Sequence, residues 1–490
     1  MRLPESSARF RRISRGQRSE GVLLLGQRIL VMGLGRFGGG AGVTAWLVSQ
    51  GARVTVTDQA SAQSLAETVR SITHLPIGLR LGGHHPNDLE NTDLVVVNPA
   101  VVKDRSEFFQ EIERRRIPWT TEMNMFCERC PATVIGVTGT YGKSTTCAML
   151  AAALEDFVAA GSTPITGVHL GGNIGKSLLN ELNRIRDSDV VVLEMSNAQL
   201  EDIPRISWRP YVAVITNLWP HHLDRHGSLE AYARAKFNII GSPLQTPIVV
   251  AGDMHDDARE LLLAVLQESP RQVCLHVEAH DPPDALRVPG PHNRRNADCV
   301  MTICDALQLP EDLVRESLHR FAGLEHRIEL VATIGGVAYV NDSKSTSPSA
   351  TMVALECFEG PVVAIVGGRR KPVSLDSCAN LLAARCKAVI CLGESGPDFA
   401  DAIGQSARQR RRATDFVREA QSLEEGVRTA AEFCEPGDTV LFSPGAPSFD
   451  GYVNFCERGA AFKRIVEMLS SSRDRAGMQR PITNQIRGRL

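Results

Sequence analysis

The sequence predicts an α/β protein of three domains, each built on a mostly parallel sheet. Short runs of β-branched residues alternate with helical stretches along most of the chain, as strand-helix-strand units do. Many of these runs end in glycine or polar residues, the pattern of strands that present ligand-binding loops at one edge of a sheet. The chain has 490 residues, enough for about three domains of ordinary size.

The domain boundaries follow shifts in composition. We expect domains at 21–130, 131–324 and 325–470. Residues 1–20 contain six arginines and few apolar residues, and residues 471–490 are rich in Arg, Ser and Gln. Both end segments are therefore predicted to be disordered tails.

The overall composition excludes several classes of protein. Lys+Arg number 54 and Asp+Glu number 56, so no global positive field attracts nucleic acid. No apolar run approaches the roughly 18 residues that span a bilayer. The twelve cysteines are scattered, and the single CxxC of Cys127 and Cys130 lacks a second pair, so we expect no metal site there. We expect a cytoplasmic monomer with reduced thiols that acts on small molecules.

The first domain opens with a Rossmann-like unit. A strand at 27–32 runs into GLGRFG at 33–38, and a helix and a second strand that ends at Asp58 follow. A further strand at 94–97 ends in Asn98. Glycines at such a turn bring the backbone close to a pyrophosphate. The pattern leaves open a dinucleotide, hence an oxidoreductase, and a UDP-sugar.

The second domain is predicted to be like a P-loop ATPase. A strand at 134–137 leads into a glycine-rich loop at 138–142, and Lys143 then opens a helix. The spacing GxxxxGK would need glycine at position 137, where this chain has Val137. A turn without a ligand would also use glycines, but it would not need a lysine and two hydroxyl residues after them. We therefore interpret the stretch as a phosphate-binding loop that faces Mg²⁺.

Other polar residues of the second domain follow strands or open helices. A valine-rich strand delivers Glu194, a position suited to holding Mg²⁺ beside a phosphate loop. His222 and Asp224 follow the next strand and are candidate neighbours of a metal or phosphate, although either residue alone is more often structural. Asn293 and Asn296 open a helix and suit hydrogen bonding to a nucleotide base.

The third domain is predicted to be doubly wound and Rossmann-like. Its strands end in the stretches NDSKST at 341–346, GGRRK at 367–371 and SPGAPSFD at 443–450. Lysines on surface loops are ordinary, but here they gather at strand ends with hydroxyl residues. The candidates for binding a small anion are Lys344, Thr346, Lys371 and Ser448.

With these motifs in view, the sequence resembles the Mur ligases over about 21–470, and within that family the branch that adds glutamate. The resemblance rests on GVTGTYGKSTT at 136–146, LEMSNAQLE at 193–201, HHLDRHGSLEAYARAK at 221–236, HNRRN at 292–296, HRIE at 326–329, NDSKST at 341–346, GGRRK at 367–371 and SPGAPSFDGYVNFCERG at 443–459.

The resemblance implies a role for each matching residue. The catalytic residues would be Lys143, Lys236, His222 and Glu194. Two Mg²⁺ ions would be held by Ser144, Thr145, Glu194, His222 and Lys236, the last as a carbamate. ATP would be bound by Gly139, Thr140, Gly142, Lys143, Ser144, Thr145, Asn173, Asn293, Asn296, Arg327, Asp342 and Lys344. The substrates would be bound by Gly35, Arg36, Phe37, Asp58, Asn98, Ser196, Gln199, Thr346, Lys371, Ser448, Phe449 and Phe455.

The resemblance also implies an activity. It predicts an ATP-dependent ligase that adds D-glutamate to UDP-N-acetylmuramoyl-L-alanine through an acyl phosphate, in peptidoglycan precursor synthesis. The first domain would bind the UDP-sugar, the second ATP and the third the amino acid. Three stretches depart from the family pattern. His221 stands where the family usually has an acid, and LEMSNAQLE at 193–201 differs from the family motif at Met195 and Asn197-Ala198. Ser347-Pro348 depart from the pattern beside the glutamate pocket. The last departure leaves L-glutamate open, and a P-loop ATPase without ligation is a further alternative.

Overall fold

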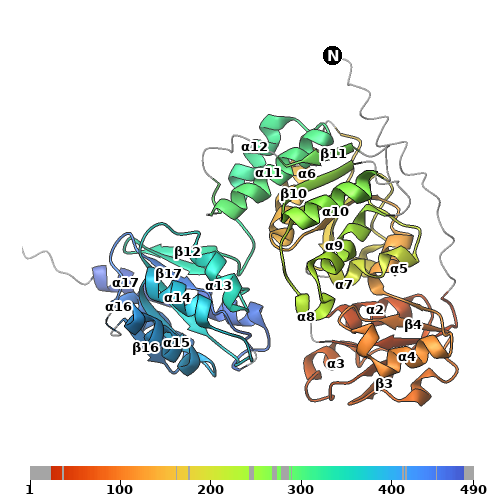
Figure 1. Ribbon diagram of the computed structural model, residues 1–490, viewed down its shortest axis with the longest axis horizontal. Helices are drawn as coiled ribbons and strands as arrows, with labels where there is room; N and C mark the ends of the chain where they lie inside the picture. The colour runs from red at the N-terminus through yellow and green to blue at the C-terminus, as the bar shows by residue number, and fades with distance from the viewer. Residues whose placement is uncertain are drawn as a thin grey trace, which may run out of the picture. The chain divides into compact units, whose positions relative to one another are not determined.

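A computed structural model describes residues 24–35, 38–161, 163–174, 177–241, 248–267, 273–277, 286–288, 290–410, 413, 416–448 and 450–478 (Figure 1). The chain divides into two compact units, the first within residues 1–285 and 294–320 and the second within residues 286–293 and 321–490. Among the helices of the described ranges, none combines the length and apolar character needed to cross a membrane.

The first unit begins with a five-stranded parallel sheet. Its strands are β1 (Arg28–Met32), β2 (Arg53–Asp58), β3 (Gly78–Leu81), β4 (Leu94–Val97) and β5 (Trp119–Thr120), in the order β3-β2-β1-β4-β5. Its helices are α2 (Gly39–Ser49), α3 (Ala66–Ile72), α4 (Glu107–Arg114) and α5 (Glu122–Arg129). Alternate residues of β1 enter different cores, Val31 with Trp46 of α2 and Leu30 with Phe108 of α4. The sheet is therefore covered on both faces, as predicted.

A second, six-stranded parallel sheet follows in the same unit. Its strands are β6 (Thr133–Thr138), β7 (Val168–Gly172), β8 (Val190–Glu194), β9 (Val212–Leu218), β10 (Ile248–Met254) and β11 (Val273–His276), in the order β11-β10-β9-β6-β8-β7. Its helices are α6 (Lys143–Ala159), α7 (Asn197–Leu200), α8 (Leu223–His226), α9 (Leu229–Phe237), α10 (Asp256–Gln267), α11 (Pro291–Ala306) and α12 (Glu311–Arg320). The central strands β6, β8 and β9 bring their carboxyl ends to one edge.

The second unit contains a six-stranded mixed sheet. Its strands are β12 (Glu329–Ile334), β13 (Val337–Asn341), β14 (Val362–Gly367), β15 (Cys386–Leu392), β16 (Val417–Ala420) and β17 (Thr439–Phe442), in the order β12-β13-β17-β14-β15-β16. The edge strand β12 is antiparallel to β13, and the other neighbours are parallel. The helices are α13 (Pro348–Leu355), α14 (Asp376–Arg385), α15 (Gly396–Gln409), α16 (Leu423–Glu432) and α17 (Phe455–Met478). Because α17 continues through Met478, the prediction of a disordered tail from residue 471 is wrong for its first part, and the rest of that tail and residues 1–20 lie outside the described residues.

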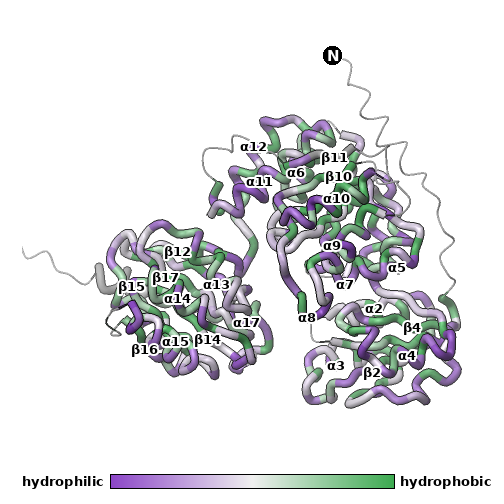
Figure 2. Tube along the Cα trace, viewed as in Figure 1, coloured by the Kyte–Doolittle hydropathy of each residue, from purple (hydrophilic) through white to green (hydrophobic). Residues whose placement is uncertain are grey.

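Helices cover both faces of this third sheet. Alternate residues of β14 divide between two cores, Ala364 with Leu382 of α14 and Ile365 with Val427 of α16. This arrangement confirms the doubly wound class, with the antiparallel edge strand as an addition. Figure 2 shows hydrophobic residues along the strands of the sheets. Short 3-10 helices complete the connections, at Pro86–Leu89, Lys103–Arg105, Leu178–Glu181, Ile203–Arg205 and Asn238–Ile240.

Two helices begin at the glycine-rich loops. Helix α2 starts at Gly39, directly after the loop, and α6 starts at Lys143, as the sequence predicted. In both cases a glycine in the left-handed region, Gly38 or Gly142, caps the helix. Each glycine-rich loop therefore meets a helix N-terminus directly, where backbone N–H groups are available to an anion.

Candidate active site

The loop between β6 and α6 has the backbone of a phosphate-binding loop. Gly139 and Gly142 have φ angles of 152° and 77°, which favour glycine. A Cβ atom at Gly139 would collide with the Thr216 hydroxyl, and one at Gly142 with the Asn296 side chain. Any larger residue at either position would therefore both strain the backbone and displace a neighbouring side chain.

The end of β9 holds this loop in place. The backbone N–H of Tyr141 donates to Asn217 Oδ1 at 2.9 Å, and the Tyr141 carbonyl accepts from Thr216 Oγ1 at 2.7 Å and from Asn217 Nδ2 at 2.9 Å. The N–H of Thr140 also donates to the Asn217 carbonyl at 3.0 Å. Sequence reasoning missed Thr216 and Asn217, and their position at the end of a buried strand was the available signal.

Lys143 brings a positive charge into the loop. Its Nζ donates to the carbonyl oxygens of Gly139 and Thr140 at 2.8 and 2.9 Å. The ammonium therefore lies beside the loop and the N-terminus of α6, so that two sources of positive potential coincide. Ser144 and Thr145 follow in the first turn of the helix.

Glu194 is a buried carboxylate at the end of β8. Its Oε1 accepts from Asn173 Nδ2 at 2.8 Å, and its backbone carbonyl accepts from the Asn173 N–H at 2.8 Å. Its Oε2 has no hydrogen-bond partner, and in the described part of the chain only one other buried side-chain oxygen or nitrogen shares this property. A buried carboxylate oxygen without a donor is costly unless a cation meets it.

Lys236 lies on α9 with its side chain 1% exposed. Its Nζ donates to the Gly139 carbonyl at 2.8 Å, so it borders the same loop as Lys143. Burial lowers the pKa of the Lys236 ammonium well below its ordinary value, the charge of Lys143 lowers it further, and Glu194 opposes the shift. The structure thus brings Lys143, Lys236 and Glu194 together beside the loop, and their catalytic role stays a prediction.

The predicted histidine ligand occupies an unusual backbone conformation. His222 has a φ of 52° and precedes α8, and its exposed ring lies 4.1 Å from the ring of His221. Across the described residues, no three His, Cys, Asp or Glu side chains gather closely enough to hold a metal. The set of Glu194, His222 and Lys236 therefore stays a prediction, and the side chain of Asp224 lies outside the described residues.

In the first sheet, two predicted residues shape the glycine-rich loop. Asp58 Oδ2 accepts from the N–H groups of Leu34 and Gly35 at 2.8 and 3.1 Å. Asn98 Nδ2 donates to the Gly33 carbonyl at 3.2 Å. Gly35, Asp58 and Asn98 are thus neighbours, and the predicted partners Arg36 and Phe37 lie outside the described residues.

Two further candidates form a helix cap. Ser196 Oγ accepts from the Gln199 N–H at 3.3 Å, and Gln199 Oε1 accepts from the Ser196 N–H at 2.9 Å. This reciprocal pair begins α7 directly after Glu194 and Met195. Their predicted contact with substrate stays a prediction.

In the second unit, predicted residues meet where β13, β14 and β17 end. Lys344 Nζ lies 3.8 Å from the centre of the Phe455 ring, a cation–π contact. Ser448 is buried, and Thr346 and Lys371 are more open. Phe449 lies outside the described residues. The structure therefore brings Lys344 and Phe455 into contact at the carboxyl edge of the sheet.

The predicted base-binding residues are divided between the two units. Asn293 belongs to the second unit and Asn296 to the first, although both lie on α11. Asn296 Oδ1 accepts from Thr146 Oγ1 at 3.3 Å, next to the phosphate loop. Arg327 and Asp342 belong to the second unit.

Asp342 is a buried acid with an unusual proton affinity. Burial raises its pKa to about 6, against hydrogen bonds from Ser345 and Ser443 and the charge of Arg327. The Ser443 hydroxyl donates to Oδ2 at 2.7 Å, and the Ile328 N–H donates to Oδ1 at 3.2 Å.

This raised pKa predicts a pH-dependent stability. The folded protein keeps the Asp342 proton up to about pH 6, whereas the unfolded chain releases it near pH 3.8. The free energy of unfolding should therefore fall between about pH 4 and pH 6, by up to about 3 kcal/mol from this group. Asp342→Asn should lack this contribution in urea denaturation, so its stability relative to the native protein should increase as pH rises through that window. Parallel pH profiles for the two proteins would contradict the assignment.

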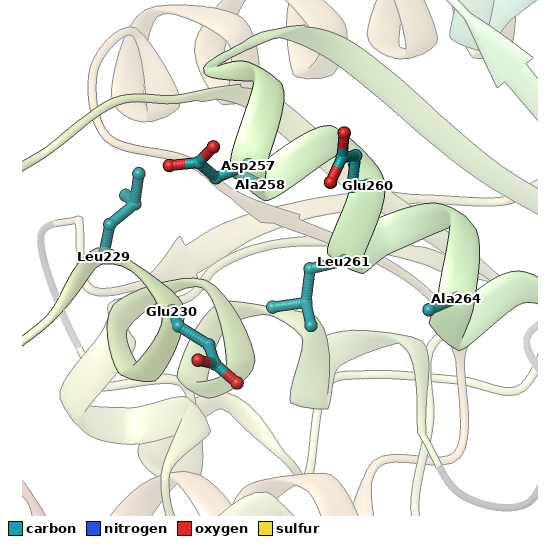
Figure 3. Close-up of a pocket in the computed structure, with 7 residues that line it drawn as sticks. All are labelled: Leu229, Glu230, Asp257, Ala258, Glu260, Leu261 and Ala264. Atoms are coloured by element: carbon teal, nitrogen blue, oxygen red, sulfur yellow. The ribbon is translucent and has the colours of Figure 1, made fainter.

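An open groove lies between α9 and α10 (Figure 3). Its volume is about 450 Å³, and its lining is Leu229, Glu230, Asp257, Ala258, Glu260, Leu261 and Ala264. None of the predicted site residues lines it, although α9 also carries Lys236.

Comparison with protein families gives three successive matches. Residues 27–117 match the MurD-like N-terminal domain of Mur ligases, residues 137–281 the Mur ligase middle domain, and residues 326–445 the glutamate ligase domain of Mur ligases. Each match falls within one of the three domains predicted from sequence.

Individual proteins match over almost the whole chain. The UDP-N-acetylmuramoylalanine–D-glutamate ligase of Symbiobacterium thermophilum is 35% identical over 91% of this chain and 99% of its own. The enzyme of the same name from Roseiflexus sp. is 34% identical over 91% of this chain and 100% of its own. Among solved structures, the UDP-N-acetylmuramate-alanine ligase MurC of Thermotoga maritima aligns with a TM-score of 0.57 at 21% identity, covering 91% of this chain and 99% of that one. The structural match shows a shared fold.

Proposed function

The chain belongs to the Mur ligase family, and from this premise we propose that it joins D-glutamate to UDP-N-acetylmuramoyl-L-alanine at the expense of ATP. Relatives that carry this name match about nine-tenths of the chain at 34–35% identity. The proposal includes a cytoplasmic monomer acting on small molecules in peptidoglycan precursor synthesis. Residues 21–130, 131–324 and 325–470 would serve the UDP-sugar, ATP and glutamate.

One observation carries the catalytic part of the proposal. A phosphate loop, a buried carboxylate with an unpartnered oxygen and a buried lysine of depressed pKa converge at the carboxyl ends of β6 and β8. ATP and a carboxylate substrate repel each other, so a site that joins them must supply positive charge where phosphate oxygens gather. Lys143 and the N-terminus of α6 supply that charge.

The residues of this site also fit Mg²⁺. Glu194 Oε2 offers an oxygen without a donor, and Ser144 and Thr145 offer hydroxyl oxygens, the hard ligands that Mg²⁺ prefers. The depressed pKa of Lys236 favours its neutral amine, which can add CO₂ with loss of a proton, and the resulting carbamate would be a second anionic ligand group beside Glu194. When bound, Mg²⁺ would neutralise charge on the phosphate oxygens.

The proposed reaction has two displacement steps. A carboxylate oxygen of the alanyl group attacks the γ-phosphorus of ATP, the bond from that phosphorus to the bridging oxygen breaks, and ADP leaves with the electron pair. The amine of glutamate then attacks the acyl carbon, the bond from carbon to the phosphate oxygen breaks, and inorganic phosphate leaves. The amine loses a proton as the amide forms. Lys143 would stabilise the phosphate oxygens during the first step, and Thr346, Lys371, Ser448 and Phe455 would orient glutamate.

An isotope experiment tests this sequence of steps. UDP-N-acetylmuramoyl-L-alanine labelled with ¹⁸O in the alanyl carboxylate should transfer one ¹⁸O atom to each phosphate released, because an acyl phosphate passes that oxygen on. The control is the same reaction with unlabelled substrate in H₂¹⁸O, in which the released phosphate should stay unlabelled. Label entering from water instead of from the carboxylate would exclude the acyl phosphate.

A binding measurement tests the metal assignment separately. Without a cation, Glu194→Gln should not reduce the melting temperature much, because it removes a buried charge with one unpartnered oxygen. Mg²⁺ should raise the melting temperature of the native protein and raise that of Glu194→Gln less, since binding to the folded state adds stability. Equal Mg²⁺-induced shifts in both proteins would contradict a role for Glu194 as a ligand. Glu230→Gln, an exposed change on α9, is a matched control.

A further inference from the structure

Arg458 is a buried cation that no assigned role explains. It lies in the first turn of α17 with its side chain 1% exposed. Its Nε donates to Ser343 Oγ at 3.1 Å, its Nη2 to the Ser343 carbonyl at 2.9 Å, and its Nη1 to the Ala446 carbonyl at 2.9 Å. Arginine is seldom so deeply buried, and burying its charge is costly unless partners satisfy it. Here the three hydrogen bonds all go to uncharged oxygens.

These hydrogen bonds join two of the strand-end loops. Ser343 lies between Asp342 and Lys344, in the loop after β13. Ala446 lies two residues before Ser448, in the loop after β17. One planar guanidinium therefore spans both loops, with Nε and Nη2 on the first and Nη1 on the second.

The same side chain lies against a third loop and the start of its own helix. A Cβ atom at Gly368, in the loop after β14, would lie 2.9 Å from Arg458 Nη1. The N–H of Arg369 donates to the Pro447 carbonyl at 2.8 Å, so the loops after β14 and β17 are also joined. The Ser343 hydroxyl donates to the Phe455 carbonyl at 2.8 Å. Arg458 is thus at the centre of a cluster that fixes the backbone beside Lys344, Phe455 and Ser448.

The positive charge of Arg458 also influences which ligands bind near these loops. Burial lowers its pKa to about 10, so the guanidinium stays protonated at neutral pH. In the described residues Arg458 forms no ion pair, and its charge is only partly offset by nearby acids such as Asp342 and Asp450. A buried positive charge next to these loops favours the binding of an anionic ligand at their exposed side, because the protein interior screens the charge less than water does.

We propose that Arg458 is a positioning residue for the amino-acid substrate: it holds the loops of Thr346 and Ser448 at a fixed separation and adds positive potential that favours a dicarboxylate. This inference rests on the proposed function. Arg458 itself, being buried behind the loops, does not touch the substrate. Its loss should weaken glutamate binding more than it weakens the binding of ATP or the UDP-sugar.

Steady-state kinetics of two variants test the proposal. Arg458→Met removes the charge and all three hydrogen bonds, and it should raise KM for glutamate by roughly 10- to 100-fold, with KM for ATP and for the UDP-sugar changed less than about threefold. Arg458→Lys keeps the charge but cannot bridge both loops, and its KM should lie between those of the native protein and Arg458→Met. Arg464→Met, an exposed change on the same helix, should leave all three constants unaltered.

The possible failures are distinguishable. If the native protein shows no glutamate-dependent phosphate release, the proposed function fails, whatever Arg458 does. If the native protein ligates glutamate and folded Arg458→Lys has the native KM for glutamate, the positioning role of Arg458 is contradicted while the proposed function stands. Equal rises in all three KM values would also overturn it, because they would indicate a general loss of structure. Should Arg458→Met not fold, the Lys variant carries the same test.

Discussion

Replacement of Lys143 by alanine is expected to reduce ATP-dependent turnover by about three orders of magnitude or more. The ammonium is the full charge that the phosphate loop brings to the γ-phosphate, and removing such a preorganised group costs on the order of 10²- to 10³-fold in rate even where other donors remain. The fold should persist, because Lys143 lies in the loop at the start of α6, where its Nζ donates to the carbonyls of Gly139 and Thr140, and it is outside the hydrophobic cores. Phosphate release at saturating substrates and a thermal melt measure the two effects.

A matched control comes from another lysine. Lys387 lies on β15 and pairs with the exposed Glu435 and the buried Asp438. Lys387→Ala should leave turnover unaltered, because this lysine is not among the predicted site residues. Normal phosphate release by folded Lys143→Ala would remove the phosphate loop from the mechanism and with it the proposed function.

Replacement of Lys236 by alanine is the second large effect expected. The native amine is buried beside the Gly139 carbonyl, and its pKa is depressed, which are conditions for carbamate formation. Its loss should reduce turnover to near background. Small carboxylates such as formate or acetate should restore part of the activity, because they offer the oxygen ligands that the carbamate would supply. The measurement is turnover of the variant against added carboxylate.

The control is a neighbouring residue of the same helix. Arg234 is exposed on α9 and pairs with Glu230, so Arg234→Ala should retain turnover and show no response to added carboxylate. If Lys236→Ala folds but no carboxylate restores any activity, that result counts against the carbamate. Lys236 would then act only through its hydrogen bonds to the loop.

Local patterns made the phosphate loop predictable. Glycines, a lysine and hydroxyl residues lie within one short stretch between a strand and a helix. The glycines allow the tight backbone turn, and the lysine and hydroxyl residues supply the polar groups that face a phosphate. Glu194 was predictable for a similar reason. It is the last residue of a valine-rich strand, and the end of such a strand lies at the edge of the sheet. In both cases the relevant neighbours are close in sequence or follow from parallel pairing.

Contacts between distant segments were not predictable in the same way. Thr216 and Asn217 hold Tyr141 from 75 and 76 residues away, and nothing in their own stretch indicates that partner. Arg458 is separated from Ser343 by 115 residues, and an arginine near a helix start ordinarily indicates an exposed side chain. The family resemblance implied that Asp58 binds a substrate, and the structure adds that its carboxylate binds the loop backbone. Such roles depend on tertiary packing.

The measurement that tests the central proposal most directly is phosphate release from ATP with Mg²⁺ and UDP-N-acetylmuramoyl-L-alanine, in the presence of D-glutamate, L-glutamate or neither. Release that requires D-glutamate, with one phosphate per amide formed, is the predicted result. Release with L-glutamate alone would retain the site and the mechanism and reassign the amino acid, with Ser347-Pro348 as the first residues to exchange. Release at the same rate without any amino acid would contradict the account, because it would describe an ATPase and not a ligase.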